Sequence, residues 1–386
     1  MSGKGPLFIV PWRCTFACDY ECVHCTSAGK SAVADELSTV EAKKLVDRIH
    51  DFGATFLGIT GGEPFMRKDL FTIVRYAKKV GLSVSVITDG HLVDDKAVKS
   101  IIKNKMRVSI SIDGMENVND RIREKGAYQS AVLLAKKLAG TGLLDCFVYT
   151  FANVGKKVTN VTEADFRHVN DLAATYGARW VVYHGMVPYS SDKKCLKADP
   201  SSAQYEWALN KLYDLGIEYN GKPYVNVYVP FYARIALQRG MPKQTFDEWY
   251  NNFFLGKCWF GRFMSIAENG DAIPCSYHDV YRFGNVKEKS LGQIWDDLQN
   301  SPFFQEARDK AKIKGKCGIC EYKEVCGGCR TAALFYTGDL MESDPRCAYV
   351  PKTMREQRSL PVRQSLRHNR RMRKNQFNLP PVVVCA

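Results

Sequence analysis

Three cysteines near the N-terminus have the spacing of a metal-binding loop. Cys18, Cys22 and Cys25 fall within eight residues, directly after a short apolar run that predicts a strand. In parallel α/β proteins, the loops at the C-terminal ends of the strands build the active site. Three thiolates can hold a 4Fe-4S cluster and leave its fourth iron open to chelate an amino and a carboxylate group. A zinc knuckle or a set of buried free thiols is the alternative, with only Cys14 or His24 near enough to supply a fourth ligand.

A second group of cysteines lies towards the C-terminus, in a stretch rich in glycine and poor in long periodic segments. Its seven members are Cys258, Cys275, Cys317, Cys320, Cys326, Cys329 and Cys347. Without an export signal, the fourteen cysteines of the chain indicate metal binding rather than disulfides. The two Cys-x2-Cys units also suit a four-thiolate zinc site. The sequence therefore predicts a metal-organised domain, with iron–sulfur and zinc both open.

Alternating strand and helix patterns in the first half of the chain are expected to position the first cysteine loop. The predicted strands are residues 7–10, 56–60, 83–88, 107–113, 146–151 and 179–184. The predicted helices between them are residues 38–53, 69–81, 95–103, 128–138 and 163–176. The first of these begins with a capping-box pattern, Ser38-x-x-Glu41. This alternation predicts a parallel sheet with right-handed crossovers and both faces covered. Six units are too few for a closed eight-stranded barrel, so we expect an open partial barrel or a doubly wound sheet. A further helix is expected at residues 205–215, and residues 217–256 show no clear periodicity.

Composition and charge indicate a globular chain. With 386 residues, 45% of them apolar, the chain can bury a large core. The apolar run at residues 7–10 is much shorter than a signal-peptide core or a membrane span, so we expect a cytoplasmic protein without a membrane partner. The net charge is +14, but residues 352–374 hold nine Lys or Arg and one acid, a net of +8. The body is only mildly basic. The basic tail either binds an anionic partner or is simply solvated.

The first cysteine loop and the sequence Gly61-Gly62-Glu63-Pro64 together resemble the radical S-adenosylmethionine (SAM) superfamily. The second motif ends the second predicted strand, where the resemblance implies that Gly61, Gly62 and Glu63 bind the amino group of SAM. Glycines let the backbone approach the ligand, and the glutamate offers a carboxylate to an ammonium group. The family has an aromatic residue just before the third cysteine. The resemblance therefore places His24 against the adenine.

Two further strand ends fit the same resemblance. Thr88 and Asp89 occupy the position where the family often has Thr-Asn-Gly contacting the ribose. Residues 109–114 resemble the fourth-strand signature, which implies that Ser111 and Arg123 contact the SAM carboxylate; Arg suits a bidentate carboxylate clamp. A solvated charge at a helix start is the alternative for Arg123. For Asp113, a turn-forming role is expected rather than catalysis.

The later cysteines resemble the SPASM domain of radical SAM maturases, except that Gly327-Gly328 leaves two residues where three are usual. The resemblance implies an outer auxiliary 4Fe-4S cluster on Cys317, Cys320, Cys326 and Cys347. An inner cluster would use Cys258, Cys275 and Cys329, with an open iron or a fourth ligand such as Cys195. Tyr277 and His278 follow Cys275 and could also approach this cluster.

The resemblance predicts an architecture and a division into domains. The fold would be a partial (β/α)6 TIM-type barrel followed by a SPASM iron–sulfur domain. We predict a radical SAM core at residues 1–200, a connecting region at 201–257, the SPASM domain at 258–350 and a basic, flexible tail at 351–386.

The implied activity is reductive cleavage of SAM to a 5′-deoxyadenosyl radical that abstracts hydrogen and modifies a substrate oxidatively. Residues 22–29 and 36–39 are similar to the mycofactocin maturase, whereas residues 326–330, 337–339 and 344–345 are similar to tetrapyrrole-modifying enzymes. We expect a peptide or protein substrate, with side-chain modification of a tetrapyrrole as the alternative. The electron donor would be a flavodoxin or ferredoxin. His184, at the end of the sixth predicted strand, is a candidate substrate contact.

Two other classes of protein stay open from the sequence alone. One is a zinc-stabilised nucleic-acid-binding protein that uses the basic tail for affinity. The other is a radical SAM scaffold whose clusters only move electrons.

Overall fold

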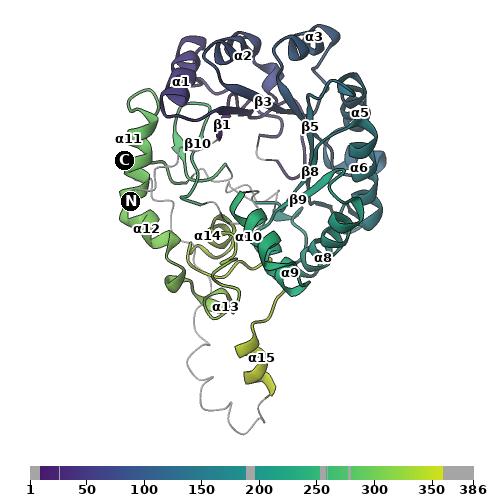
Figure 1. Cartoon of the computed structure of the whole chain (residues 1–386), viewed down its shortest axis with the longest axis vertical. Helices are drawn as coiled ribbons and strands as arrows, with labels where there is room; N and C mark the ends of the chain where they lie inside the picture. The colour runs from purple at the N-terminus through teal and green to yellow at the C-terminus, as the bar shows by residue number, and fades with distance from the viewer. Residues whose placement is uncertain are drawn as a thin grey trace.

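The computed structural model describes residues 9–25, 27–187, 196–252, 258, 260–276 and 280–359, without the side chains of residues 248–252 and 357–359. Within these residues, nine strands form one curved sheet (Figure 1). In the order in which they pair, they are β11 (Ala272–Ile273), β10 (Ser265–Ile266), β1 (Ile9–Arg13), β2 (Phe56–Thr60), β3 (Ser83–Thr88), β4 (Arg107–Ser111), β5 (Leu144–Thr150), β8 (Trp180–His184) and β9 (Tyr224–Tyr228). Every neighbouring pair is parallel except β10 and β11. The sheet is therefore an open partial barrel.

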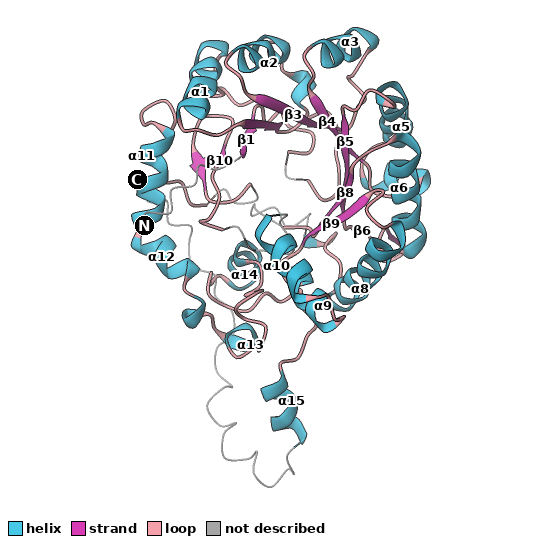
Figure 2. Cartoon of the chain, viewed as in Figure 1, coloured by secondary structure: helices cyan, strands magenta, loops and turns pink. Residues whose placement is uncertain are grey.

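Helices cover the convex side of this sheet, as Figure 2 shows. They are α1 (Thr39–Asp51), α2 (Leu70–Lys79), α3 (Asp95–Lys103), α4 (Glu116–Ile122), α5 (Ala127–Leu138), α6 (Glu163–Tyr176) and α8 (Ser202–Tyr219). The helix α1 begins with the predicted capping box, in which Ser38 and Glu41 exchange hydrogen bonds between side chain and backbone. The alternation of predicted strands and helices in the sequence therefore corresponds to βα units in the structure.

The two faces of the sheet differ in burial. Residues that point to the helices form the main core, among them Val10, Ile59, Val86 and Ile110, each at most 1% exposed. The residues that alternate with them, such as Ser85 and Ser111, are partly exposed on the concave face. The expectation that both faces are covered is therefore wrong for the concave face. This concave face of the sheet, called the lumen below, carries partly exposed polar side chains.

The six predicted strands are present; β1 is described from Ile9 to Arg13, and residues 7–8 of the first predicted strand lie outside the described residues. One parallel strand, β9, lies in residues 217–256, which show no clear periodicity in the sequence. Val225 and Val227 are buried and alternate with Tyr224, Asn226 and Tyr228. This pattern has a period of two, but the tyrosines on the exposed positions carry large apolar rings, so the contrast between apolar and polar positions is weak. The partial barrel therefore has one more βα-type strand than predicted.

The cysteine-rich region continues the barrel sheet. The strand β10 pairs with β1 through Trp12 and Ile266, and Arg13 donates to Glu268 over 2.5 Å, with both side chains 11% exposed. This region also contains α11 (Leu291–Asn300), α12 (Pro302–Arg308), α13 (Gly315–Gly318) and α14 (Arg330–Thr337). Between them and the barrel lie α9 (Tyr232–Gln238) and α10 (Lys243–Asn252), and α15 (Lys352–Ser359) follows the last cysteine-rich segment.

A buried ion pair also fastens the cysteine-rich region to the barrel. Arg346 makes a bidentate pair with Asp344, and its Nη1 donates to the carbonyl oxygen of Met186, just after β8, over 2.6 Å. Asp344 also accepts from the backbone N–H of Cys329 at 3.0 Å. A buried charge that loses its partner is costly, so this link fixes the position of Cys329 relative to the barrel. The proposed domain boundaries stay predictions.

Candidate functional site

The first cysteine loop folds into a compact unit at the C-terminal end of β1. Cys18 and Cys22 are each 8% exposed and pack with Tyr20, and Cys25 packs against them. The N–H of Cys18 donates to the carbonyl of Lys30 at 2.8 Å and closes the loop. Burial raises the pKa of Cys18 to about 12. Such buried thiols become thiolates when a metal cluster takes the place of the proton, so the loop suits the three ligands of a 4Fe-4S cluster.

The Gly61-Gly62 turn lies directly against this loop. The N–H of Gly62 donates to Thr15 O at 2.9 Å, and the N–H of Glu63 donates to Ala17 O at 2.7 Å. A Cβ on Gly62 would stand 2.0 Å from Ala17 O, and one on Gly61 would stand 2.4 Å from Thr15 O. Only glycine permits this approach. The tertiary structure thus joins the two motifs on which the family resemblance rests.

Glu63 is a buried carboxylate, 1% exposed, at the end of β2. It accepts hydrogen bonds from Thr88 Oγ1 at 2.9 and 3.0 Å, from the N–H of Asp89 at 3.1 Å and from the N–H of Phe65 at 3.0 Å. Burial and then the charge of Asp89 raise the pKa of Glu63 to about 8. A cation brought beside Glu63 would relieve both effects, which is what the ammonium group of SAM would do.

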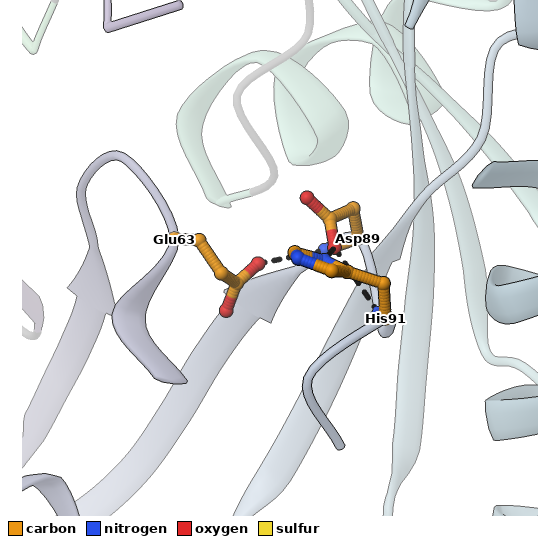
Figure 3. A group of neighbouring side chains, drawn as sticks. All are labelled: Glu63, Asp89 and His91. Carbon is orange, nitrogen blue, oxygen red and sulfur yellow. Dashed lines mark hydrogen bonds and ion pairs between the residues drawn. The ribbon is translucent and has the colours of Figure 1, made fainter. Parts of the chain in front are cut away.

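His91 belongs to the same cluster of side chains and was missed from the sequence (Figure 3). Its Nδ1 lies 2.5 Å from Asp89, its Nε2 lies 2.8 Å from Asp19, and its ring stacks on Tyr20 with centroids 4.3 Å apart. Burial lowers the pKa of His91, but the two carboxylates outweigh this and raise it to about 9. A protonated imidazole donates from both nitrogens and does not ligate a metal. His91 therefore ties the end of β3 to the cysteine loop; its place directly after Thr88-Asp89-Gly90 was the only sequence signal.

A second polar group gathers around Asp113, just after β4. Asp113 is fully buried, accepts from the N–H of Thr150 at 2.6 Å, and has Arg123 Nε 2.7 Å and His24 Nε2 3.8 Å from its Oδ2. Burial lowers the pKa of His24 to about 4, so its ring is neutral. Within the described chain, His24 Nδ1 is buried without a hydrogen-bond partner, and Asp113 Oδ2 and Arg123 Nε, which form an ion pair with each other, have no aligned hydrogen bond besides it. These atoms are suited to meet a polar ligand, and Asp113 does more than form a turn.

The sequence-predicted SAM residues thus fall into two neighbouring sets. Glu63, Thr88 and Asp89 are joined by hydrogen bonds, and His24 and Arg123 meet at Asp113. Ser111 ends β4 on the partly exposed, concave face. All of them lie at or beyond the C-terminal ends of parallel strands, the side of such folds that binds ligands.

Four of the later cysteines line a single cavity. Cys317, Cys320, Cys326 and Cys347 surround a space of about 380 Å³ that is partly open to solvent. Burial raises the pKa of Cys326 well above its usual range and that of Cys347 to about 11. Four convergent thiols, of which Cys317 is buried and the other three are partly buried, fit a cluster with four thiolate ligands.

The remaining three cysteines of this region are Cys258, Cys275 and Cys329. Cys258 and Cys275 both pack against the apolar cluster that contains Phe260. The pKa of Cys329 is raised to about 11, mainly by burial and to a smaller extent by the charge of Cys258. Cys195, Tyr277 and His278, considered as additional ligands, lie outside the described residues, as does the tail beyond residue 359. Among the described helices, none combines the length and apolarity of a membrane span.

Comparison with known proteins gives two family matches. Residues 12–169 match the radical SAM superfamily, and residues 258–330 match the SPASM family, an iron–sulfur cluster-binding domain. The AdoMet-dependent heme synthase of Methanosarcina barkeri is 32% identical over 351 residues, which cover 89% of this chain and 97% of that protein. The mycofactocin maturase of Mycolicibacterium smegmatis is 27% identical over 356 residues, covering 87% of this chain and 81% of the maturase.

Solved structures support the fold. The structure of SuiB from Streptococcus suis bound to S-adenosylmethionine superposes with a TM-score of 0.68 and 16% sequence identity. The match covers 89% of this chain and 77% of SuiB. At this identity the likeness concerns the architecture alone.

Proposed function

Because the chain belongs to the radical SAM superfamily, in its SPASM subgroup, and is therefore a radical SAM enzyme, we propose that it oxidatively modifies the side chains of a tetrapyrrole. The observation that carries this proposal is the match to the heme synthase, which extends over 97% of that relative at 32% identity. From the sequence alone, a peptide or protein substrate is expected first and a tetrapyrrole second. The maturase has a lower sequence identity to this chain than the heme synthase, and the match covers less of either protein. A tetrapyrrole substrate is therefore ranked above a peptide.

A peptide substrate is the second candidate, supported by the 27% identity to the mycofactocin maturase. Membership of a radical SAM family decides against a zinc-stabilised nucleic-acid-binding protein. A flavodoxin or ferredoxin as electron donor is part of the proposal.

In this proposal, each group of residues binds a different part of the clusters or of SAM. Cys18, Cys22 and Cys25 hold the first cluster; Gly61, Gly62 and Glu63 receive the ammonium group of SAM, because the buried carboxylate needs a cation. Thr88 and Asp89 face the ribose, Ser111 and Arg123 the carboxylate, and neutral His24 the adenine. When bound, the first cluster and SAM supply a 5′-deoxyadenosyl radical that abstracts hydrogen from an unactivated carbon. The outer cluster would be held by Cys317, Cys320, Cys326 and Cys347, and the inner cluster by Cys258, Cys275 and Cys329.

The proposed substrate class can be tested directly. Anaerobically purified, iron-reconstituted protein is mixed with SAM, a reductant and an iron porphyrin whose propionate side chains carry deuterium. We expect deuterium to appear in 5′-deoxyadenosine. The amount of labelled 5′-deoxyadenosine should equal the amount of porphyrin whose mass has changed. If 5′-deoxyadenosine forms without deuterium while the porphyrin stays intact, the tetrapyrrole proposal is wrong. If no 5′-deoxyadenosine forms under any condition, the electron-transfer scaffold is favoured.

His184 is the proposed substrate contact in the lumen. It ends β8, its ring stacks on that of Tyr228 at the end of β9 with centroids 4.9 Å apart and planes 6° apart, and burial lowers its pKa to about 4. A neutral, planar pair at the C-terminal strand ends suits a flat, π-rich macrocycle. We expect His184→Ala to lower the kcat/KM for the porphyrin at least tenfold, about 1.4 kcal/mol, with the Kd for SAM unchanged. Steady-state product formation and SAM binding measure the two effects.

A matched control lies on the same strand pair. The rings of Trp180 and Tyr224 lie together on the same face at the opposite ends of β8 and β9, with centroids 4.7 Å apart and planes tilted by 32°. Tyr224→Phe should leave kcat/KM unchanged. A loss for this variant equal to that of His184→Ala would show that the strands as a whole, rather than the lumen contact, are responsible.

A further inference from the structure

We propose that Arg234 is a positioning residue for the outer cluster and sets its reduction potential through a hydrogen bond to the Cys347 sulfur. The inference rests on the outer-cluster ligands proposed above and is independent of the tetrapyrrole substrate. It adds a residue of α9, which precedes the cysteine-rich region, to a site whose four thiols come from that region.

The contact to the sulfur is direct. Arg234 comes from α9, between the last barrel strand and the cysteine-rich region, and its side chain is 2% exposed. Its Nη2 lies 3.9 Å from Cys347 Sγ, and the residue lines the same cavity as the four cysteines. A buried guanidinium aimed at a thiol is costly unless its charge and donors are used.

Other groups fix the orientation of the guanidinium. Its Nη1 donates to Glu206 Oε1 at 2.6 Å and to Gln238 Oε1 at 2.7 Å, and its Nη2 donates to Glu206 Oε2 at 2.5 Å. The plane also lies over the ring of Tyr349, with Cζ 4.8 Å from the ring centroid. The bidentate pair and the aromatic stack hold one Nη2 hydrogen towards Cys347, a fork geometry that lysine cannot reproduce.

This arrangement has a definite electronic effect. Reduction adds one electron to a cluster that thiolates already make anionic, and N–H donors to the sulfurs stabilise the added charge. Because Glu206 neutralises the charge of Arg234, the net charge of this pair has little effect on the cluster. The N–H···S hydrogen bond is therefore the main influence of Arg234 on the reduction potential. Because Glu206 lies on α8 and Arg234 on α9, the barrel side of the molecule controls the potential of the outer cluster.

The test compares reduction potentials by EPR-monitored redox titration of the full-length, reconstituted protein. Arg234→Met removes the donors, and Arg234→Lys keeps the charge without the fork. The matched control is Arg239→Met, because Arg239 also pairs with an acid, Asp214, and lies over a tyrosine ring, Tyr213, but away from the cysteines. Iron content and thermal melting are measured on each variant.

We expect Arg234→Met to lower one auxiliary potential so that the ratio of reduced to oxidised cluster falls at least tenfold, about 59 mV for one electron. Arg234→Lys should give a smaller shift in the same direction, and Arg239→Met none. Unchanged potentials in Arg234→Met at full iron content would overturn the proposal. If Arg234→Met loses iron, an unshifted potential in Arg234→Lys would also overturn it, because the role would then be structural. Wild-type protein that lacks the outer cluster would instead refute the ligand assignment itself.

Discussion

Replacement of Cys18, Cys22 and Cys25 together by alanine is expected to abolish 5′-deoxyadenosine formation. The three thiols are the ligands proposed for the first cluster, and they lie together in one buried loop. Without these thiols, the first cluster, whose open iron would bind SAM, has no protein ligands. The seven cysteines from residue 258 onwards are unchanged. Iron content should fall by about four of about twelve atoms per chain. The auxiliary clusters should remain, so the protein should stay brown. Elemental analysis and chromatography of the nucleoside products measure both changes.

The matched control for this prediction is Cys14→Ala. Cys14 is fully buried and only four residues before Cys18, and its carbonyl accepts from Arg67. The variant should keep its iron and its 5′-deoxyadenosine formation. Equal losses in Cys14→Ala would make Cys14 a ligand, and a triple variant that still cleaves SAM would refute the loop as the site of the first cluster.

Glu63→Gln is expected to weaken SAM binding at least tenfold at pH 7.5. The carboxylate is buried among hydrogen-bond donors from Thr88 and Asp89, and hydrogen bonds to charged groups contribute about 1.5–3 kcal/mol. Glutamine keeps the shape but cannot neutralise an ammonium group. Equilibrium binding of SAM to reconstituted protein gives the Kd, and Glu41→Gln, in the exposed capping box of α1, is the control.

The pH dependence of SAM binding provides a second test of Glu63. Since burial raises the pKa of Glu63 to about 8, the free carboxyl group is mostly protonated at pH 6–7.5 and must lose its proton to pair with an ammonium. SAM binding should therefore strengthen as pH rises across this range, by up to about tenfold per unit, and should release a proton. Calorimetry in buffers of different ionisation enthalpy detects the proton. A Glu63→Gln variant that retains the same pH dependence would contradict this role.

Much of the site was predictable because its signals are local. The spacing of Cys18, Cys22 and Cys25 and the Gly61-Gly62-Glu63 sequence identified the family, and the capping box at Ser38 located a helix start that the structure retains. The strand β9 was missed because the aromatic rings of the tyrosines on the open face weaken the contrast with the buried valines beside them. The concave face was expected to be covered, since strand sequences alone do not tell which face meets helices.

The first cysteine loop shows where the sequence alone stops. The sequence determined which side chains can hold a cluster, because spacings over a few residues fix which thiols can share a loop. Only the tertiary structure placed the glycine turn against that loop, brought His91 between Asp89 and Asp19, and set Arg234 beside Cys347, 113 residues away. The order of strands in the sheet and the pairing of β1 with β10 decide such contacts. They depend on crossovers and long-range packing, which no local pattern of residues encodes.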